Sequence, residues 1–144
     1  MRAPEVFLGQ SCTGTSQVWA VAAMILCWIK PGILGVADSP SPIINEAWCM
    51  AKLLRLFPRW EFPSPDEFER PSLKASVKSA SRIKEMEEMQ HISSLEEEMT
   101  KLEIPQELRD LLRLMLVTDP SKRPSASFVL ASAEFRALEK IVGI

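Results

Sequence analysis

The chain has 144 residues, of which 47% are hydrophobic and 25% are charged, and its formal net charge is −2. This length and apolar content suit one folded domain with its own core and exclude an intrinsically disordered chain. The slightly acidic balance argues against a nucleic-acid binder, because such proteins normally present a basic face.

The first long apolar segment is Gln17–Ile29, after a loop with a short helical turn at residues 1–16. Apolar side chains occur on nearly all of its faces, which predicts a helix buried on every side. Pro31 and Gly32 end it. Because its apolar run is shorter than the roughly 20 residues that a bilayer requires, we expect no membrane-spanning segment.

A second helix is predicted over Asn45–Phe57, after a loop at residues 31–44 that contains three Pro and two Gly. Asn45 can cap this helix, Glu46 suits the positive end of its dipole, and Lys52 suits the negative end. Prolines follow it, and residues 61–73 are predicted to be irregular.

Residues 81–102 have the pattern of one amphipathic helix, with apolar side chains at spacings of three or four. Two roles fit this stripe, namely packing against the rest of the domain and docking of a coiled-coil partner. The stripe covers under three heptads, which favours packing. The acidic run Glu96-Glu97-Glu98 is interpreted as a solvated helix face, because adjacent helical side chains diverge too much to share an ion.

The C-terminal part predicts three more helices, from Pro105 to Leu116, from Ser125 to Leu130 and from Ala133 to Ile141. Asp119-Pro120 ends the first of these helices before the second begins. No segment alternates apolar and polar residues as a strand does. The sequence therefore predicts an all-α fold.

Cysteine and histidine do not form a recognisable site. Cys12, Cys27 and Cys49 are odd in number and lack C-x-x-C spacing, which indicates free thiols and a cytoplasmic or nuclear protein. The single histidine, His91, is predicted to be a solvated residue on a helix surface.

Two strings near the ends of the chain carry a resemblance. They are Arg2-Ala-Pro-Glu-Val-Phe-Leu-Gly9 and Asp119-Pro-Ser-Lys-Arg123-Pro-Ser-Ala. Together they resemble the two ends of the C-terminal lobe of a eukaryotic Ser/Thr protein kinase, in the group of cyclin-dependent, MAP and dual-specificity kinases. The intervening Ser16–Ala22 is similar to the start of that lobe's central helix, and Asn45–Pro58 to its next surface helix. Residues 1–144 then form a partial kinase-like domain with an insert at about 66–102.

The resemblance implies roles for a few residues. In the family, the Glu of Ala-Pro-Glu makes a buried ion pair with the Arg of the later turn, which here implies Glu5 and Arg123. The first string supports the peptide substrate in that family, so Arg2 and Pro4 are candidates for peptide or partner docking. Trp48 is a third docking candidate, with packing inside the domain as the favoured alternative.

The chain differs from the family at two positions and lacks several of the family's motifs. Gln17 stands where the family has an acidic residue that holds the catalytic loop, and Ala22 replaces a glycine. There is no glycine-rich loop, Val-Ala-Ile-Lys lysine, His-Arg-Asp or Asp-Phe-Gly motif. We therefore expect a chain truncated before the catalytic motifs, without the N-terminal β lobe. ATP and Mg²⁺, which the complete family domain binds, are not expected to bind here, and no residue is predicted to be catalytic or a metal ligand.

Three functions follow as hypotheses. The first is a scaffold and peptide-docking lobe of a kinase-like domain that has no activity alone. The second is a stand-alone α-helical interaction module, similar to a pseudokinase adaptor. The third is a membrane-associated protein built on Val18–Val36. Under the first, a protein partner, the N-terminal kinase lobe or a second copy of the chain would cover apolar surface on the central helix.

Overall fold

Helices account for all of the regular structure in the computed structural model, which describes residues 1–144. The α-helices are α1 (Pro4–Phe7), α2 (Gly14–Ile29), α3 (Asn45–Leu56), α4 (Pro71–Ile83), α5 (Leu95–Lys101), α6 (Gln106–Met115), α7 (Ala126–Ala131) and α8 (Ala133–Val142). Three short 3₁₀ helices connect them: η1 (Pro42–Ile44), η2 (Pro65–Glu67) and η3 (Glu87–Met89). The all-α prediction is confirmed.

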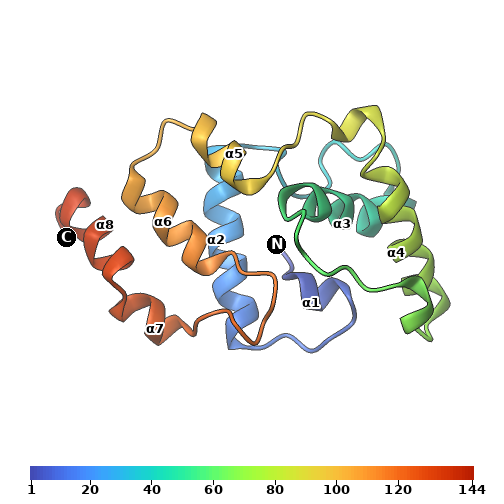
Figure 1. The fold of residues 1–144 in the computed structure, drawn as a ribbon, viewed down its shortest axis with the longest axis horizontal. Helices are drawn as coiled ribbons and strands as arrows, with labels where there is room; N and C mark the ends of the chain where they lie inside the picture. Colours follow the sequence, from blue (N-terminus) through green and yellow to red (C-terminus); the bar gives the residue numbers. More distant parts are fainter.

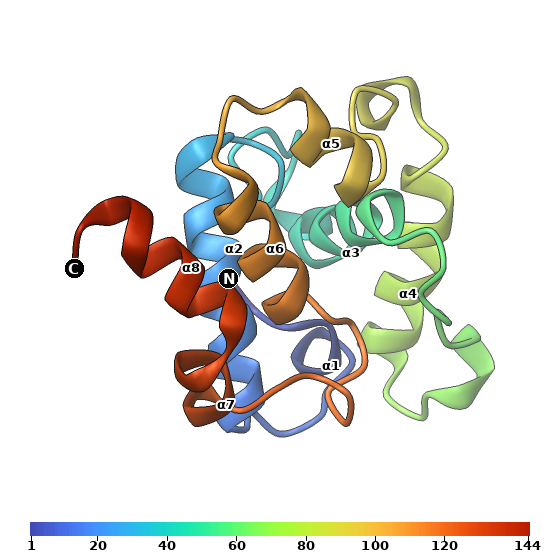
Figure 2. The same ribbon diagram turned by 60° about the vertical axis from the view of Figure 1, so that its left-hand side comes forward.

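The helix α2 lies near the middle of the molecule (Figure 1). On one side of it lie α6, α7 and α8, and on the other lie α1 and α3, with α4 at the outer edge. The last helix, α8, points away from the body and carries the C-terminus at its tip (Figure 2). One hydrophobic cluster runs from Ala3 to Val129, so these helices share a single core.

The start of α2 is set by a reciprocal cap. Thr13 and Ser16 exchange hydrogen bonds in a capping box, and the helix therefore begins at Gly14, earlier than predicted. Its buried side chains include Trp19 and Leu26, both at most 1% exposed. The prediction that α2 is buried on every side is wrong. An apolar stripe of Val21, Met24 and Trp28 faces outward, and a helix that is apolar all round gives no local signal for which face is left uncovered.

The prediction of a single helix over residues 81–102 is also wrong. The chain instead forms α4, which starts at Pro71 inside the segment predicted to be irregular, then η3 and α5. Proline suits the first turn of α4, and a capping box between Ser94 and Glu97 starts α5 as a separate helix. The apolar side chains of the stripe are nevertheless mostly buried, on α4, η3, α5 and the segment between η3 and α5 instead of on one helix. His91 is exposed, as expected, but it lies in a turn instead of on a helix.

The remaining helices match their predictions to within two residues, because α3, α6, α7 and α8 each have local start or stop signals. One detail differs. Asn45 is the first residue of α3 and does not cap it, because η1 leads directly into the helix through Ile44.

No helix in this fold combines the length and the apolar character needed to cross a bilayer.

Candidate functional site

The centre of the site is an ion pair between the two ends of the resemblance. Glu5 lies in α1, and Arg123 lies in the turn that leads to α7. The Nη1 of Arg123 donates to Oε1 of Glu5 at 2.8 Å, and its Nη2 donates to Oε2 at 2.9 Å. Both side chains are buried, at 0% exposed for Arg123 and 4% for Glu5. The structure therefore brings together, in a two-pronged contact, residues that are 118 positions apart.

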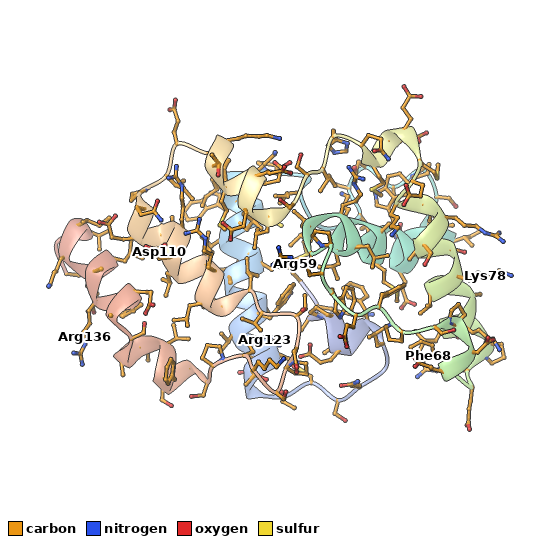
Figure 3. All side chains as sticks on the ribbon, viewed as in Figure 1. Arg59, Phe68, Lys78, Asp110, Arg123 and Arg136 are labelled. Atoms are coloured by element: carbon orange, nitrogen blue, oxygen red, sulfur yellow. The ribbon has the colours of Figure 1, made fainter.

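Arg123 uses the rest of its donors on backbone oxygens. Its Nε donates to the carbonyl of Val117 at 2.8 Å, its Nη1 to that of Thr15 at 3.0 Å and its Nη2 to that of Thr118 at 3.4 Å. All five N–H groups of the guanidinium are thus engaged. The side chain joins α1, the first turn of α2 and the segment after α6, close to the centre of Figure 3.

Glu5 is held in its charged form. Burial raises the pKa of this carboxyl, but hydrogen bonds from Arg123 and from Ser16 Oγ, at 2.8 Å, outweigh it and place the pKa below its usual value. The guanidinium also lies 5.1 Å from the centre of the Trp19 ring, which is itself fully buried. Because both charges are fully paired, the arrangement suits a structural ion pair that holds these segments together. It does not suit proton transfer.

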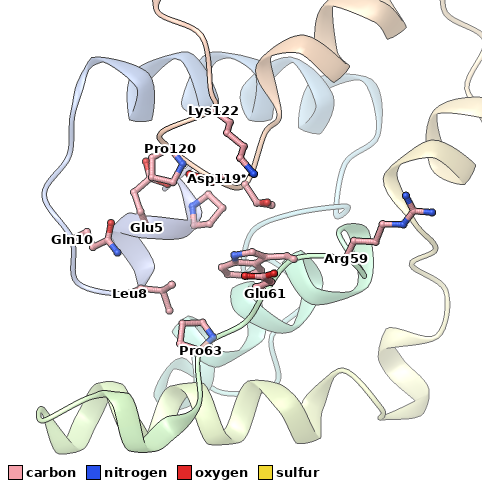
Figure 4. Close-up of a pocket in the computed structure, with 12 residues that line it drawn as sticks. Glu5, Leu8, Gln10, Arg59, Glu61, Pro63, Asp119, Pro120 and Lys122 are labelled. Atoms are coloured by element: carbon pink, nitrogen blue, oxygen red, sulfur yellow. Dashed lines mark ion pairs between the residues drawn. The ribbon is translucent and has the colours of Figure 1, made fainter.

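A cavity of about 390 Å³ lies next to the pair (Figure 4). Its lining includes Pro4, Leu8, Trp60 and the ion-paired Asp119 and Lys122, with 3.7 Å between Oδ2 and Nζ. The volume lies in the range of about 300–1,000 Å³ that is usual for ligand sites.

The three candidate docking residues have different surroundings. Pro4 lines the cavity. Arg2 is exposed and faces Glu46 of α3, with 3.5 Å between Nη1 and Oε1. Trp48 is only 2% exposed and donates from Nε1 to Asp38 Oδ1 at 3.1 Å, so the structure places it in the core and not at a docking surface.

A second buried charge fixes the loop between α2 and α3. Lys52 is 0% exposed, and its Nζ donates to Asp38 Oδ1 at 2.6 Å and to the carbonyl of Gly32 at 2.8 Å. Burial raises the pKa of Asp38, but the bonds from Lys52 and Trp48 outweigh it and lower the pKa overall. The sequence analysis assigns Lys52 only a role at the helix dipole, because no local signal indicates this contact.

The interpretation of the acidic run as a solvated face is wrong for one of its members. Glu98 is 0% exposed and forms an ion pair with Lys30, while its Oε1 accepts a hydrogen bond from the backbone N–H of Ser93 at 2.9 Å. These bonds lower the pKa of Glu98 against the opposing effect of burial. A partner 68 residues away cannot be found from local spacing.

No protein-family model, curated protein or solved structure matches this chain.

An apolar groove lies between α2, α6, α7 and α8, on the helix where the sequence analysis expects uncovered apolar surface. It has a volume of about 560 Å³ and is lined mainly by Val18, Val21, Ile25, Leu111, Met115, Val129, Leu130 and Phe135. Farther along α2, Met24 is 61% exposed and Trp28 is 85% exposed. Gln17 also lines this groove and is exposed. The groove and the outer stripe of α2 thus place several large apolar side chains of one helix at the surface.

No group of three or more His, Cys, Asp or Glu side chains has the arrangement of a metal site.

Proposed function

We propose that this chain is the helical C-terminal lobe of a Ser/Thr protein-kinase-like domain, which supports and docks peptides and transfers no phosphate by itself. The buried contact between Glu5 and Arg123 carries this proposal. The resemblance implies an ion pair between these two positions, and the two side chains meet with bidentate geometry. Two unrelated surface charges would not be buried together with every guanidinium donor used.

The order of the helices adds support. The central helix expected after the first string corresponds to α2, and the surface helix after it corresponds to α3. The segment expected to be an insert, 66–102, contains most of η2 and all of α4, η3 and α5.

The cavity beside the ion pair is the proposed place for peptide docking. It opens next to Pro4, whose segment supports the peptide substrate in the family, and Trp60 offers a partly exposed aromatic wall. A peptide held there would contact the scaffold without meeting any group able to position ATP, because the 144 residues contain none of the phosphate-binding or Mg²⁺-binding motifs.

A chimera tests the proposal. In the chimera, the 144-residue chain replaces the segment of an active kinase of the cyclin-dependent or MAP group that runs from its Ala-Pro-Glu motif to the end of its C-terminal lobe. We expect the chimera to melt cooperatively and to gain several degrees in Tm with saturating MgATP, since a ligand that binds only the folded state raises its stability. The isolated chain should show no such shift.

The matched control is the same chimera with Arg123→Met, which should melt at a lower temperature than the unmodified chimera. A chimera that shows no nucleotide-dependent shift, beside a parent kinase that does, contradicts the lobe assignment. A shift in the isolated chain contradicts the proposed lack of nucleotide binding.

A stand-alone interaction module is the second candidate, and the outward stripe of α2 favours it. Val21, Met24 and Trp28 are 48%, 61% and 85% exposed on one face of α2, and a contiguous apolar stripe of this kind marks interaction surfaces in other proteins. Light scattering on the purified chain tests whether a second copy covers this stripe. A stable dimer at micromolar concentration that Trp28→Lys converts to a monomer, together with a chimera that shows no MgATP shift, supports the module, whereas a chimera that shows the shift supports the lobe.

A further inference from the structure

The helix α4 carries a row of cations along its outer side. Arg70 stands at its N-cap, and Lys74, Lys78 and Arg82 follow at intervals of four residues, all of them exposed. No acidic residue occurs between Arg70 and Lys84. In a chain with a net charge of −2, this is a local excess of positive charge.

The opposite side of α4 explains why the row faces solvent. Leu73, Val77, Ala80 and Ile83 are buried, and the helix packs mainly against α3. α4 forms one edge of the molecule, and Lys78 projects from it away from the other helices (Figure 3). None of the large exposed apolar side chains belongs to α4.

Most cations of the row form no ion pair within the chain. Lys74 Nζ lies 3.4 Å from Asp66 Oδ1, whose side chain is 89% exposed, whereas Arg70, Lys78 and Arg82 make no ion pair. Like charges four residues apart on a helix repel each other, so helix stability does not account for their spacing.

The charges at both ends of the row limit what can bind it. Asp66, Glu67 and Glu69 precede the row, and Glu85, Glu87 and Glu88 follow it. A long polyanion such as nucleic acid would be repelled at both ends and would find no aromatic side chain on α4 for its bases. A membrane surface would normally require large apolar side chains beside the cations.

We propose that this row docks a short acidic peptide segment of a partner protein in an extended conformation. Four helical residues advance about 6 Å, so the cations repeat at about that distance. Every second side chain of an extended peptide repeats at about 6.6 Å on one face. Acidic residues at alternate positions therefore match the row, and its length of roughly 18 Å suits a segment of about six to eight residues. The row belongs to α4 alone and does not require the kinase-like assignment.

The test uses fluorescence anisotropy with a fluorescein-labelled octapeptide of alternating Glu and Ser. Lys78→Glu/Arg82→Glu reverses two cations of the row. Arg136→Glu/Lys140→Glu is the matched control, because these residues have the same spacing, are also exposed and lie on α8 at the other end of the molecule (Figure 3). We expect the first variant to weaken binding at least about tenfold and the control to change it less than about twofold, since only nearby charges act at about 150 mM salt.

Several results would overturn the proposal: no peptide binding by the unmodified chain, equal losses in the two variants, or tighter binding of single-stranded DNA or of phosphatidylserine vesicles that depends on the same two cations. Self-association of the chain that is lost in the first variant would identify a second copy as the occupant and would also overturn it. If circular dichroism shows that the charge reversal disrupts α4, Lys78→Gln/Arg82→Gln replaces it, with a smaller loss in the same direction expected.

Discussion

Replacing Arg123 by Met tests the buried ion pair that joins α1 to the turn before α7. Methionine keeps much of the aliphatic volume beside the Trp19 ring but removes the charge and all five donors. It leaves the carboxylate of Glu5, which is 4% exposed, with only Ser16 Oγ as a side-chain donor. The folded state then contains a buried charge without its counter-charge.

The expected loss follows from that burial. Removing one partner of a buried ion pair destabilises a protein by about 3–5 kcal/mol. At about 3 °C for each kcal/mol in a chain of this size, Tm should fall by roughly 9–15 °C. This is a large part of the typical stability of a domain, which is about 5–15 kcal/mol.

The assay is thermal and urea unfolding followed by circular dichroism, run as a double-mutant cycle with Glu5→Gln. The double variant should lose less free energy of unfolding than the two single variants lose together, because it contains no unpaired charge. Arg113→Met is the matched control. Arg113 also contacts a carboxylate at two points, with Nε 2.9 Å and Nη2 2.8 Å from Glu96 Oε2, but Glu96 is 61% exposed. That variant should lose less than about 1 kcal/mol.

A decrease in Tm of less than about 3 °C for Arg123→Met, or a decrease no larger than that of Arg113→Met, would refute the reasoning.

Three further predictions concern other charged or exposed residues. Because the pKa of Glu5 lies below its usual value of 4.5, its ion pair stabilises the fold above that pH and the contribution is lost as pH falls below it, so Glu5→Gln should flatten the decrease of Tm below pH 4.5. Lys52→Met removes the donor to Gly32 and Asp38 and should reduce the free energy of unfolding in urea by about 1–3 kcal/mol, while limited proteolysis shows faster cleavage between α2 and α3. An unchanged cleavage rate would contradict that role. Trp28→Lys should leave Tm within about 2 °C and increase solubility, because its side chain is 85% exposed, and a large decrease in Tm would show that the side chain is packed.

The sequence predicted the helices whose limits have local causes. α6 follows from Pro105 and the apolar spacing of Leu108, Leu111 and Leu112, and α7 and α8 are capped by Ser125 and Ser132. Such signals act within one or two turns, so a single sequence is enough to find them.

The predictions that were wrong concern features whose causes are not local in the sequence. The apolar spacing over 81–102 is the same whether one helix or three short elements bring those side chains to the core. Nothing near Glu98 in the sequence indicates Lys30 as its partner, and nothing near Trp28 indicates which face of α2 is left open. These features depend on contacts between segments that are far apart in the chain, and the contact of Glu5 with Arg123 could be named in advance only through the resemblance.

The most direct measurement of the central claim is the nucleotide sequence upstream of the Met1 codon in full-length transcripts, translated in the same frame. If the chain is the C-terminal lobe of a kinase-like domain, that sequence should encode His-Arg-Asp and then Asp-Phe-Gly shortly before Met1. An in-frame stop codon directly upstream of Met1, with neither motif encoded, would contradict the lobe assignment.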